Sequence, residues 1–204
     1  MELSYNLGMA ESRIFMLMFL CIASSASAQH VSCRTNYYAV VGSDLREIHQ
    51  SMRSSRPRQT GGHDGFTVWN VSWRFNTLHN GTVCRVNGFS TTTAITITLP
   101  RWTAPTNATD TVKAEWARYI QALGQHEYGH AQFAMVAAGE IQKGVRALGD
   151  DSSCDSLKQR VSSLCDGTLQ KYKGLDAAYD QRTNHGINDG ARLGRGEWRR
   201  AAPE

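Results

Sequence analysis

The sequence predicts an α+β fold: a small antiparallel sheet with one helix in its N-terminal half, followed by two long helices packed antiparallel. Three observations support this prediction. Residues 33–102 are rich in β-branched and aromatic residues that alternate with polar ones, as in strands with one buried face. From Thr111 onward, apolar residues recur every three or four positions, as in an amphipathic helix. The tract GDDSSC (149–154) divides this helical stretch in two.

The first 28 residues have the pattern of a secretory signal peptide. The apolar run IFMLMFLCI (14–22) is too short to cross a bilayer as a helix. A positive charge precedes it, and Ala26-Ser27-Ala28 has the small residues of a cleavage site. Cleavage after Ala28 would leave residues 29–204 as a single secreted or periplasmic domain with a basic C-terminal tail. Met1 and Met9 are both candidate starts.

The net charge of +4 at pH 7 comes from scattered Lys and Arg residues, which are dense only in the tail ARLGRGEWRR (191–200). No aromatic residues are interleaved with them in the manner of a nucleic-acid-binding surface, so we expect no nucleic-acid partner. We also expect a monomer with no membrane span in the mature chain.

The expected elements of the N-terminal half follow in order. TNYYAVV (35–41) reads as a strand, and SDLREIHQSM (43–52) as a helix that opens at Ser43, with Glu47 near the capping-box position. Two or three antiparallel strands then follow. In TVWNVSWRF (67–75) and TTTAITITL (91–99) the buried face would carry every second residue: Trp69, Val71, Trp73, Phe75, Ile95, Ile97 and Leu99.

Two helices make up the C-terminal half. The first starts at Thr111 and continues to Leu148, and the second carries apolar residues from Leu157 to Tyr179. The glycine-rich tract NHGINDGARLGRG (184–196) ends the second helix.

Four cysteines remain after cleavage, which in an exported chain predicts two disulfides. Cys154 and Cys165 are separated by eleven residues of predicted helix, about 16 Å, so they cannot bond to each other. Two connectivities stay open: Cys33–Cys165 with Cys84–Cys154, or Cys33–Cys154 with Cys84–Cys165.

The stretch QHEYGH (125–130) lies within the first long helix. His126 and His130, four residues apart, would project from one face and reach the same cation. Glu127, about 100° around the helix, would act as a general base toward water at that cation without binding the metal. This pattern predicts a zinc site with metallopeptidase chemistry.

Such a site needs a third protein ligand. His126 lies about 33 Å from the end of the first helix, and the same length along an antiparallel second helix leads to Asp180. Asp180 and His185 in YDQRTNHG (179–186) are both candidates. Asp180 is better placed by the helix count, whereas histidine is the commoner zinc ligand; the other residue would orient the site.

Other residues receive minor roles. Tyr128 and Tyr179 are candidate oxyanion donors, although packing is the commoner role for such aromatic residues. His49, His63 and His79 have no paired partner in the sequence pattern and are interpreted as surface residues.

HEYGH and YDQRTNHG, together with LPRW (99–102) and WNVSW (69–73), resemble a bacterial family of unknown function whose members are described as predicted secreted zinc-dependent proteases. The resemblance spans roughly residues 33–190. It implies a zincin-like metallopeptidase, with His126, Glu127 and His130 in the motif and Asp180–His185 in the downstream signature.

The leading hypothesis is therefore an exported zinc-dependent endopeptidase that acts on a peptide or protein substrate. A strand at 91–99, at the edge of the sheet, would hold the extended peptide beside the metal. Two alternatives remain: a non-catalytic exported module with a structural metal, and a metal-dependent amidase acting on cell-wall peptides.

Overall fold

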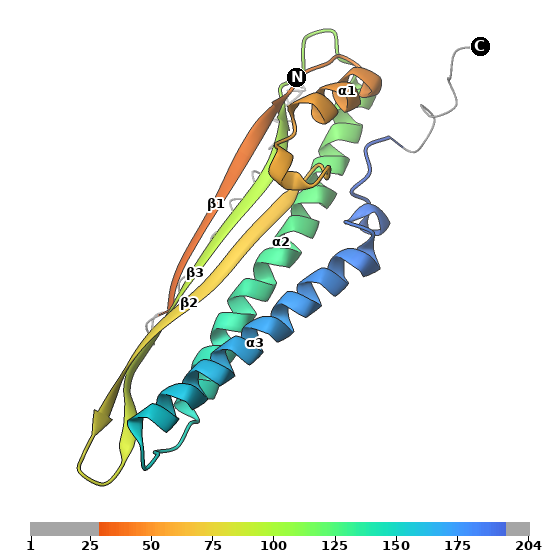
Figure 1. The fold of residues 1–204 in the computed structure, drawn as a ribbon. Coiled ribbons are helices and arrows are strands. Elements are labelled where there is room, and N and C mark those ends of the chain that lie inside the picture. Colours follow the sequence, from red (N-terminus) through yellow and green to blue (C-terminus); the bar gives the residue numbers. More distant parts are fainter. Residues whose placement is uncertain (1–28, 195–204) are drawn as a thin grey trace, which may run out of the picture.

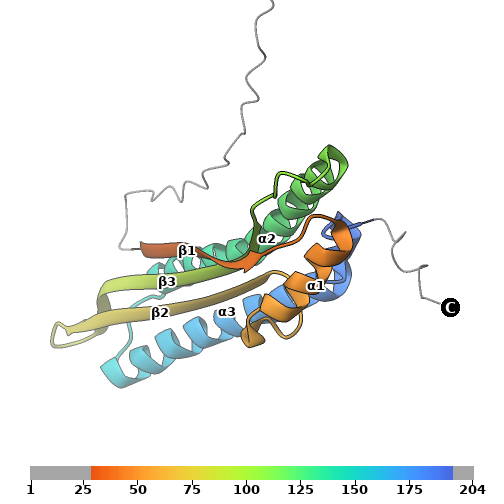
Figure 2. The same ribbon diagram turned by 90° about the horizontal axis from the view of Figure 1, so that it is seen from above.

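The computed structural model describes residues 29–194, so the predicted signal peptide and most of the basic tail lie outside the described residues. Three strands form one sheet, and two long helices run along one of its faces (Figures 1 and 2). This confirms the α+β class. Among the helices that the structure describes, none has the length and apolar character of a membrane span. The elements are β1 (Gln29–Val40), α1 (Leu45–Ser55), β2 (Phe66–His79), β3 (Cys84–Trp102), α2 (Asp110–Arg146) and α3 (Cys154–Thr183), with short 3-10 turns at Arg58–Thr60 and Ile187–Asp189.

The sheet is mixed, and the prediction of an antiparallel sheet was wrong. β3 lies in the centre, antiparallel to β2 and parallel to β1. The alternation of apolar and polar residues did identify the face that packs on the helices, since Val71, Ile95 and Ile97 are buried there. A period of two assigns each residue to a face but does not specify the neighbouring strand. Residues 91–99 are therefore central, and the prediction that this segment is a peptide-binding edge was also wrong.

α1 is capped by Asp44, not by Ser43 as predicted. The Asp44 carboxylate accepts a hydrogen bond of 2.8 Å from the backbone N–H of Glu47. Glu47 in turn accepts hydrogen bonds from the N–H and the hydroxyl of Ser43. Glu47 thus has the reciprocal capping role expected of it. The buried apolar residues of α1, Ile48 and Met52, belong to a cluster that includes residues of α2.

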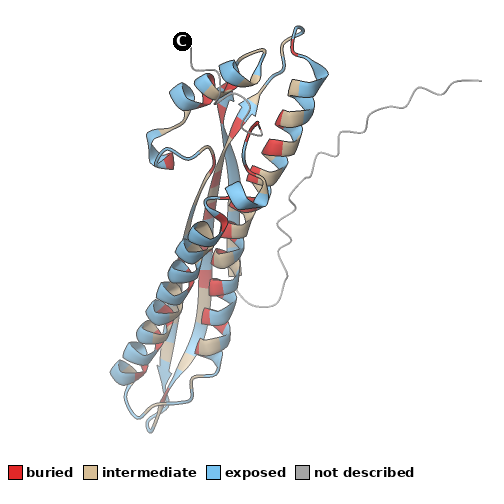
Figure 3. Cartoon of the chain, turned by 90° about the vertical axis from the view of Figure 1, so that its right-hand side faces the viewer, coloured by how far each residue is buried: buried red, intermediate tan, exposed pale blue. Residues whose placement is uncertain are grey.

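Two clusters of buried side chains flank residues 126–130 of α2. On one side, small residues such as Ala134 and Ala138 let α2 approach the sheet closely, next to Val71 and Ile95. On the other side, aromatic residues of α2 pack with α1, β1 and residues 191–193. The buried positions follow the faces where the helices meet the sheet and each other (Figure 3). The polar motif is therefore held between two apolar clusters.

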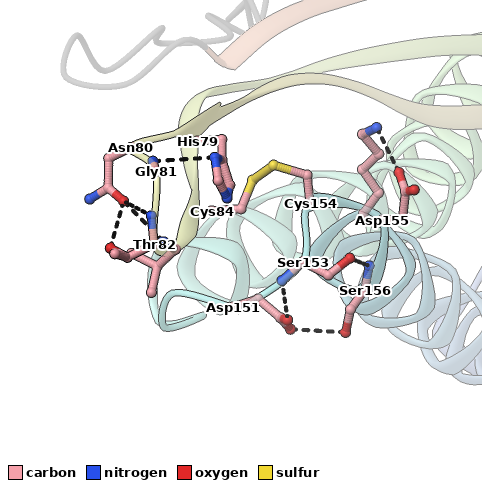
Figure 4. The surroundings of a disulfide bond; sticks show 12 residues. His79, Asn80, Gly81, Thr82, Cys84, Asp151, Ser153, Cys154, Asp155 and Ser156 are labelled. Atoms are coloured by element: carbon pink, nitrogen blue, oxygen red, sulfur yellow. Dashed lines mark hydrogen bonds and ion pairs between the residues drawn. A yellow bond between two sulfur atoms is a disulfide. The ribbon is translucent and has the colours of Figure 1, made fainter.

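A disulfide between Cys84 and Cys154 joins the β2–β3 hairpin to the first residue of α3 (Figure 4). The N–H and C=O of Cys84 also exchange hydrogen bonds with Asp151. This bond belongs to one predicted connectivity and shows that the other, Cys33–Cys154 with Cys84–Cys165, was wrong. The companion bond, Cys33–Cys165, is not formed. Cys165 has a free thiol, which is buried in the apolar cluster between the helices and the sheet.

Candidate metal centre

The predicted histidine pair lies on α2 as expected. His126 and His130 are one helical turn apart and both are buried. Their Nε2 atoms are 3.2 Å from each other. Burial lowers the pKa of His126, and the neighbouring His130 lowers it further. His126 is therefore mainly neutral at pH 7, the form in which a ring nitrogen can bind a cation.

Asp180 of α3 brings a third donor atom to this pair. Its Oδ1 lies 3.1 Å from Nε2 of His126 and 3.1 Å from Nε2 of His130. Ligand atoms around a tetrahedral cation, at about 2.0–2.1 Å from it, lie about 3.3 Å from one another. The three atoms therefore have the spacing of three ligands to one ion with a fourth position left open. His126, His130 and Asp180 together could hold a metal ion.

His185 lies beside Asp180 and outside this group of three donors. Its Nδ1 is 3.3 Å from Asp180 Oδ1, and 44% of its side chain is exposed. Both Asn184, the C-cap of α3, and His185 have left-handed backbone conformations, with φ of 49° and 52°. Such values are uncommon for residues other than glycine and tend to occur at functional sites. In this arrangement, His185 is placed to orient the carboxylate that meets the histidine pair.

Asp176 is a site residue that the sequence analysis missed. It lies one turn before Asp180 on α3, and its Oδ1 is 2.7 Å from Nδ1 of His130. Its Oδ2 accepts a hydrogen bond of 3.1 Å from the indole N–H of Trp69 on β2. Burial lowers the pKa of His130, but the hydrogen bond and charge of Asp176 outweigh it, so the net pKa is raised. The available signal was its spacing: Asp176 and Asp180 repeat the four-residue interval of the two histidines.

Glu127 is buried next to the donor group, with only 4% of its surface exposed. The hydroxyl of Thr67 on β2 is 2.7 Å from its Oε2. Its Oε1 lies over the bare Cα of Gly65, where a Cβ atom would come within 2.5 Å of it. Burial raises the pKa of Glu127 to about 7, while the Thr67 hydrogen bond acts in the opposite direction. A carboxylate that titrates near neutral pH can both accept and return a proton.

The two tyrosines that were candidate oxyanion donors have packing roles in the structure. The Tyr179 ring stacks on His126 with 4.9 Å between centroids and meets His130 edge-on at 5.1 Å. This packing requires glycine at position 129, since a Cβ there would lie 2.6 Å from the Tyr179 hydroxyl. Tyr128 packs against the cluster between the helices and the sheet.

The loop formed by residues 61–65 reaches the site from the side of α1. Its Asp64 accepts a hydrogen bond of 2.9 Å from the Tyr119 hydroxyl and lies 3.5 Å from Arg56. This anchored loop places His63 on His185, with the ring centroids 3.9 Å apart. His63 is exposed, as expected, but the expectation that it has no partner was wrong. Its contact depends on loop geometry, which has no periodicity in the sequence.

The segment after α3 is tied to α1 and α2 beside the site. Arg118 of α2 donates hydrogen bonds to the carbonyl oxygens of Gly190 and Arg192. His49 of α1 is hydrogen-bonded through Nε2 to the carbonyl oxygen of Leu193 at 3.0 Å, so it too has a partner, and it is half-buried, whereas a surface residue was expected. His79 is exposed, as expected, and its Nδ1 accepts from the N–H of Gly81.

Together these elements border a half-open cavity of about 880 Å³ at the donor group, a volume typical of ligand sites. His126, Glu127, His130 and Asp180 line it, together with α1, loop 61–65 and residues 184–193. Arg53 and Arg192 also line it, and neither has an acidic partner among residues 29–194. The cavity thus has a donor group that could hold a metal ion and, among residues 29–194, two cationic side chains without an acidic partner.

The model of one protein family, described as a bacterial protein of unknown function (DUF922), matches residues 35–186. The matched range contains the histidine pair, Glu127, Asp176 and Asp180. No curated protein and no solved structure matches the chain.

Proposed function

The chain belongs to DUF922, a family of bacterial proteins of unknown function, and we propose that it is an exported, zincin-like metallopeptidase. One observation carries the proposal: the donor triangle of His126, His130 and Asp180 has Glu127 buried beside it in a cavity of ligand size. Two imidazoles and one carboxylate form a ligand set that catalytic zinc sites use, with the fourth position open. The disulfide Cys84–Cys154 supports export, since such bonds persist in oxidising compartments.

The residues around the triangle support hydrolysis more than a purely structural metal. A zinc ion at these atoms would supply a Lewis acid that polarises a carbonyl group and acidifies water. Glu127 would take the proton of the attacking water and return it to the leaving amine. The Thr67 hydroxyl holds one Glu127 oxygen at 2.7 Å, which leaves Oε1 for the water. A structural zinc site has four protein ligands, whereas this group has three.

The charges along the cavity favour peptides with acidic side chains near the cleaved bond. Arg53 lies one turn after His49 on α1, and His49 is hydrogen-bonded to Leu193, the neighbour of Arg192. Both arginines line the cavity. A carboxylate placed there would form charge-assisted hydrogen bonds with guanidinium groups. R53Q and R192Q should therefore raise the KM for acidic peptides more than the KM for neutral ones.

The proposal is tested by replacing Glu127 with glutamine, which keeps the shape but removes the base. Zinc-loaded wild type should cleave casein or a mixed peptide library. E127Q should lose at least about 100-fold in kcat while it retains zinc. E140Q, a change at an exposed glutamate on the same helix, is the matched control and should retain activity. If wild type binds zinc but cleaves neither peptides nor peptidoglycan fragments, the metal is structural and the proposal is wrong.

A further inference from the structure

A chain of hydrogen bonds connects three elements behind the donor group. Trp69 on β2 donates its indole N–H to Oδ2 of Asp176 on α3, at 3.1 Å. Oδ1 of the same carboxylate lies 2.7 Å from Nδ1 of His130 on α2. Trp69 packs against the apolar cluster between the sheet and the helices. Its indole N–H, the first donor in this series of hydrogen bonds, therefore has a fixed position.

The direction of these hydrogen bonds determines where the proton of His130 resides. An indole N–H can only donate, and an ionised carboxylate can only accept. Both partners of Asp176 must therefore be donors, so Nδ1 of His130 carries a hydrogen. In the neutral ring this leaves the lone pair on Nε2, the atom that faces His126 and Asp180 at 3.2 and 3.1 Å.

The two histidines of the pair differ in this respect. Nδ1 of His126 is buried and has no hydrogen-bond partner among the residues the structure describes. The ring of His126 is held by stacking on Tyr179, and Gly186 lies so close that a Cβ there would be 2.8 Å from Cγ of His126. Packing thus orients His126, whereas hydrogen bonding sets both the orientation and the tautomer of His130.

We propose that Trp69 and Asp176 are positioning residues that hold His130 in the tautomer competent to bind the metal, with Trp69 fixing Asp176 and Asp176 fixing His130. This inference rests on the metal site of the proposed function. It also gives a role to the first tryptophan of the WNVSW segment, Trp69, which the proposed reaction does not use. Partners of this kind, one step behind the ligand, typically change metal affinity about 10–100-fold.

The test uses D176N, W69F and the double variant W69F/D176N. In D176N the amide has one oxygen for two donors, so its NH₂ group must face either His130 or Trp69. W69F removes one of these donors and lets the amide oxygen face His130. D176N should therefore weaken zinc binding about 10–100-fold, and W69F/D176N should bind zinc more tightly than D176N alone. A change that only loosened the fold would make the double variant worse.

Zinc affinity is measured by competition with a chelating dye, and the Co²⁺ absorption spectrum reports ligand geometry without any substrate. D166N, at an exposed position of α3, and W73F, on the same strand and inner face as Trp69, are matched controls and should bind like wild type. In the metal-free protein, ¹⁵N NMR should show His130 protonated at Nδ1, and D176N should shift it toward the Nε2–H form.

The outcomes separate this inference from the proposed function. If wild type takes up no zinc, the proposed metal site is wrong, and the NMR comparison still tests the tautomer. If wild type binds zinc and D176N binds like D166N, the positioning role is refuted while the metal site stands. The positioning role is also refuted if W69F/D176N binds zinc more weakly than D176N does. Should D176N not fold, W69F measured against W73F decides: a several-fold weaker affinity in W69F alone supports the role, and equal affinities refute it.

Discussion

Replacing Gly129 with alanine should separate close packing at the metal centre from the general effect of alanine on a helix. An alanine in place of a glycine inside a helix normally stabilises a protein by about 0.5–1 kcal/mol. At Gly124 and Gly139, on the same helix α2, a Cβ atom would meet nothing within 4 Å. G124A and G139A should therefore show this gain.

At Gly129 the added methyl group meets Tyr179. The added Cβ would lie 2.6 Å from the Tyr179 hydroxyl and 2.8 Å from Cζ. The first distance is about 0.8 Å shorter than an ordinary contact of 3.4 Å. Moving the ring by that amount disturbs its packing on His126 and His130. Overpacking of this kind costs about 1–3 kcal/mol. The free energy of unfolding of G129A should thus lie about 1–3 kcal/mol below that of G124A.

The assay is urea unfolding of the three metal-free variants, followed by zinc titration of each with a competing dye. Zinc affinity should fall in G129A only, because Tyr179 touches both imidazoles. If G129A gains as much stability as G124A and G139A and binds zinc like them, Tyr179 does not pack over residue 129, and the reasoning about this side of the site fails.

D180A should weaken zinc binding far more than H185A, because D180A deletes a donor atom whereas H185A deletes only a partner of that donor, which costs about tenfold; equal losses in equilibrium dialysis would contradict this division of roles. In the metal-free protein, burial raises the pKa of Glu127 from 4.5 to about 7, so the folded chain binds that proton more tightly than the unfolded chain. The free energy of unfolding should then fall as pH rises from about 4.5 to 7, more steeply in wild type than in E127Q, and parallel urea-derived curves would rule this out. The paired substitution C84S/C154S should cost about 4 kcal/mol, because the disulfide closes a loop between residues 70 apart; an unchanged urea midpoint would show that it adds no stability.

The helices of this protein could be predicted well from sequence because helical periodicity and helix length are local quantities. The expected starts and ends of α2 and α3 lie within a few residues of those observed. Counting equal lengths along two antiparallel helices placed Asp180 level with His126, and the two side chains are 3.1 Å apart. A rise of 1.5 Å per residue is the same in every α-helix, so this estimate needed no knowledge of the side chains.

Features that depend on long-range contacts were harder to predict. The parallel pairing of β1 with β3 was missed because the alternation of apolar and polar residues shows which face of the sheet a side chain is on, but not which strand lies next to it. His63 was missed because its contact with His185 depends on a loop anchored by the Asp64 side chain. Asp176 was missed for a different reason: it is not a metal-ligand candidate by itself, and its role appears only when His130 lies opposite it.

The metal centre depends on the register of α3 against α2. His126 contacts Asp180 and His130 contacts Asp176. The two histidines are four residues apart on α2 and the two aspartates are four residues apart on α3, so both contacts need the same register. A slip of one turn would move Asp180 by about 5.4 Å, far more than contacts of about 3 Å can tolerate. The disulfide Cys84–Cys154 fixes the first residue of α3 to the β2–β3 hairpin, and the left-handed turn at Asn184 fixes its end. Since the helix is held at both ends and a one-turn slip would leave only one of the two histidines opposite an aspartate, one register is selected, and the donor group can form before any metal binds.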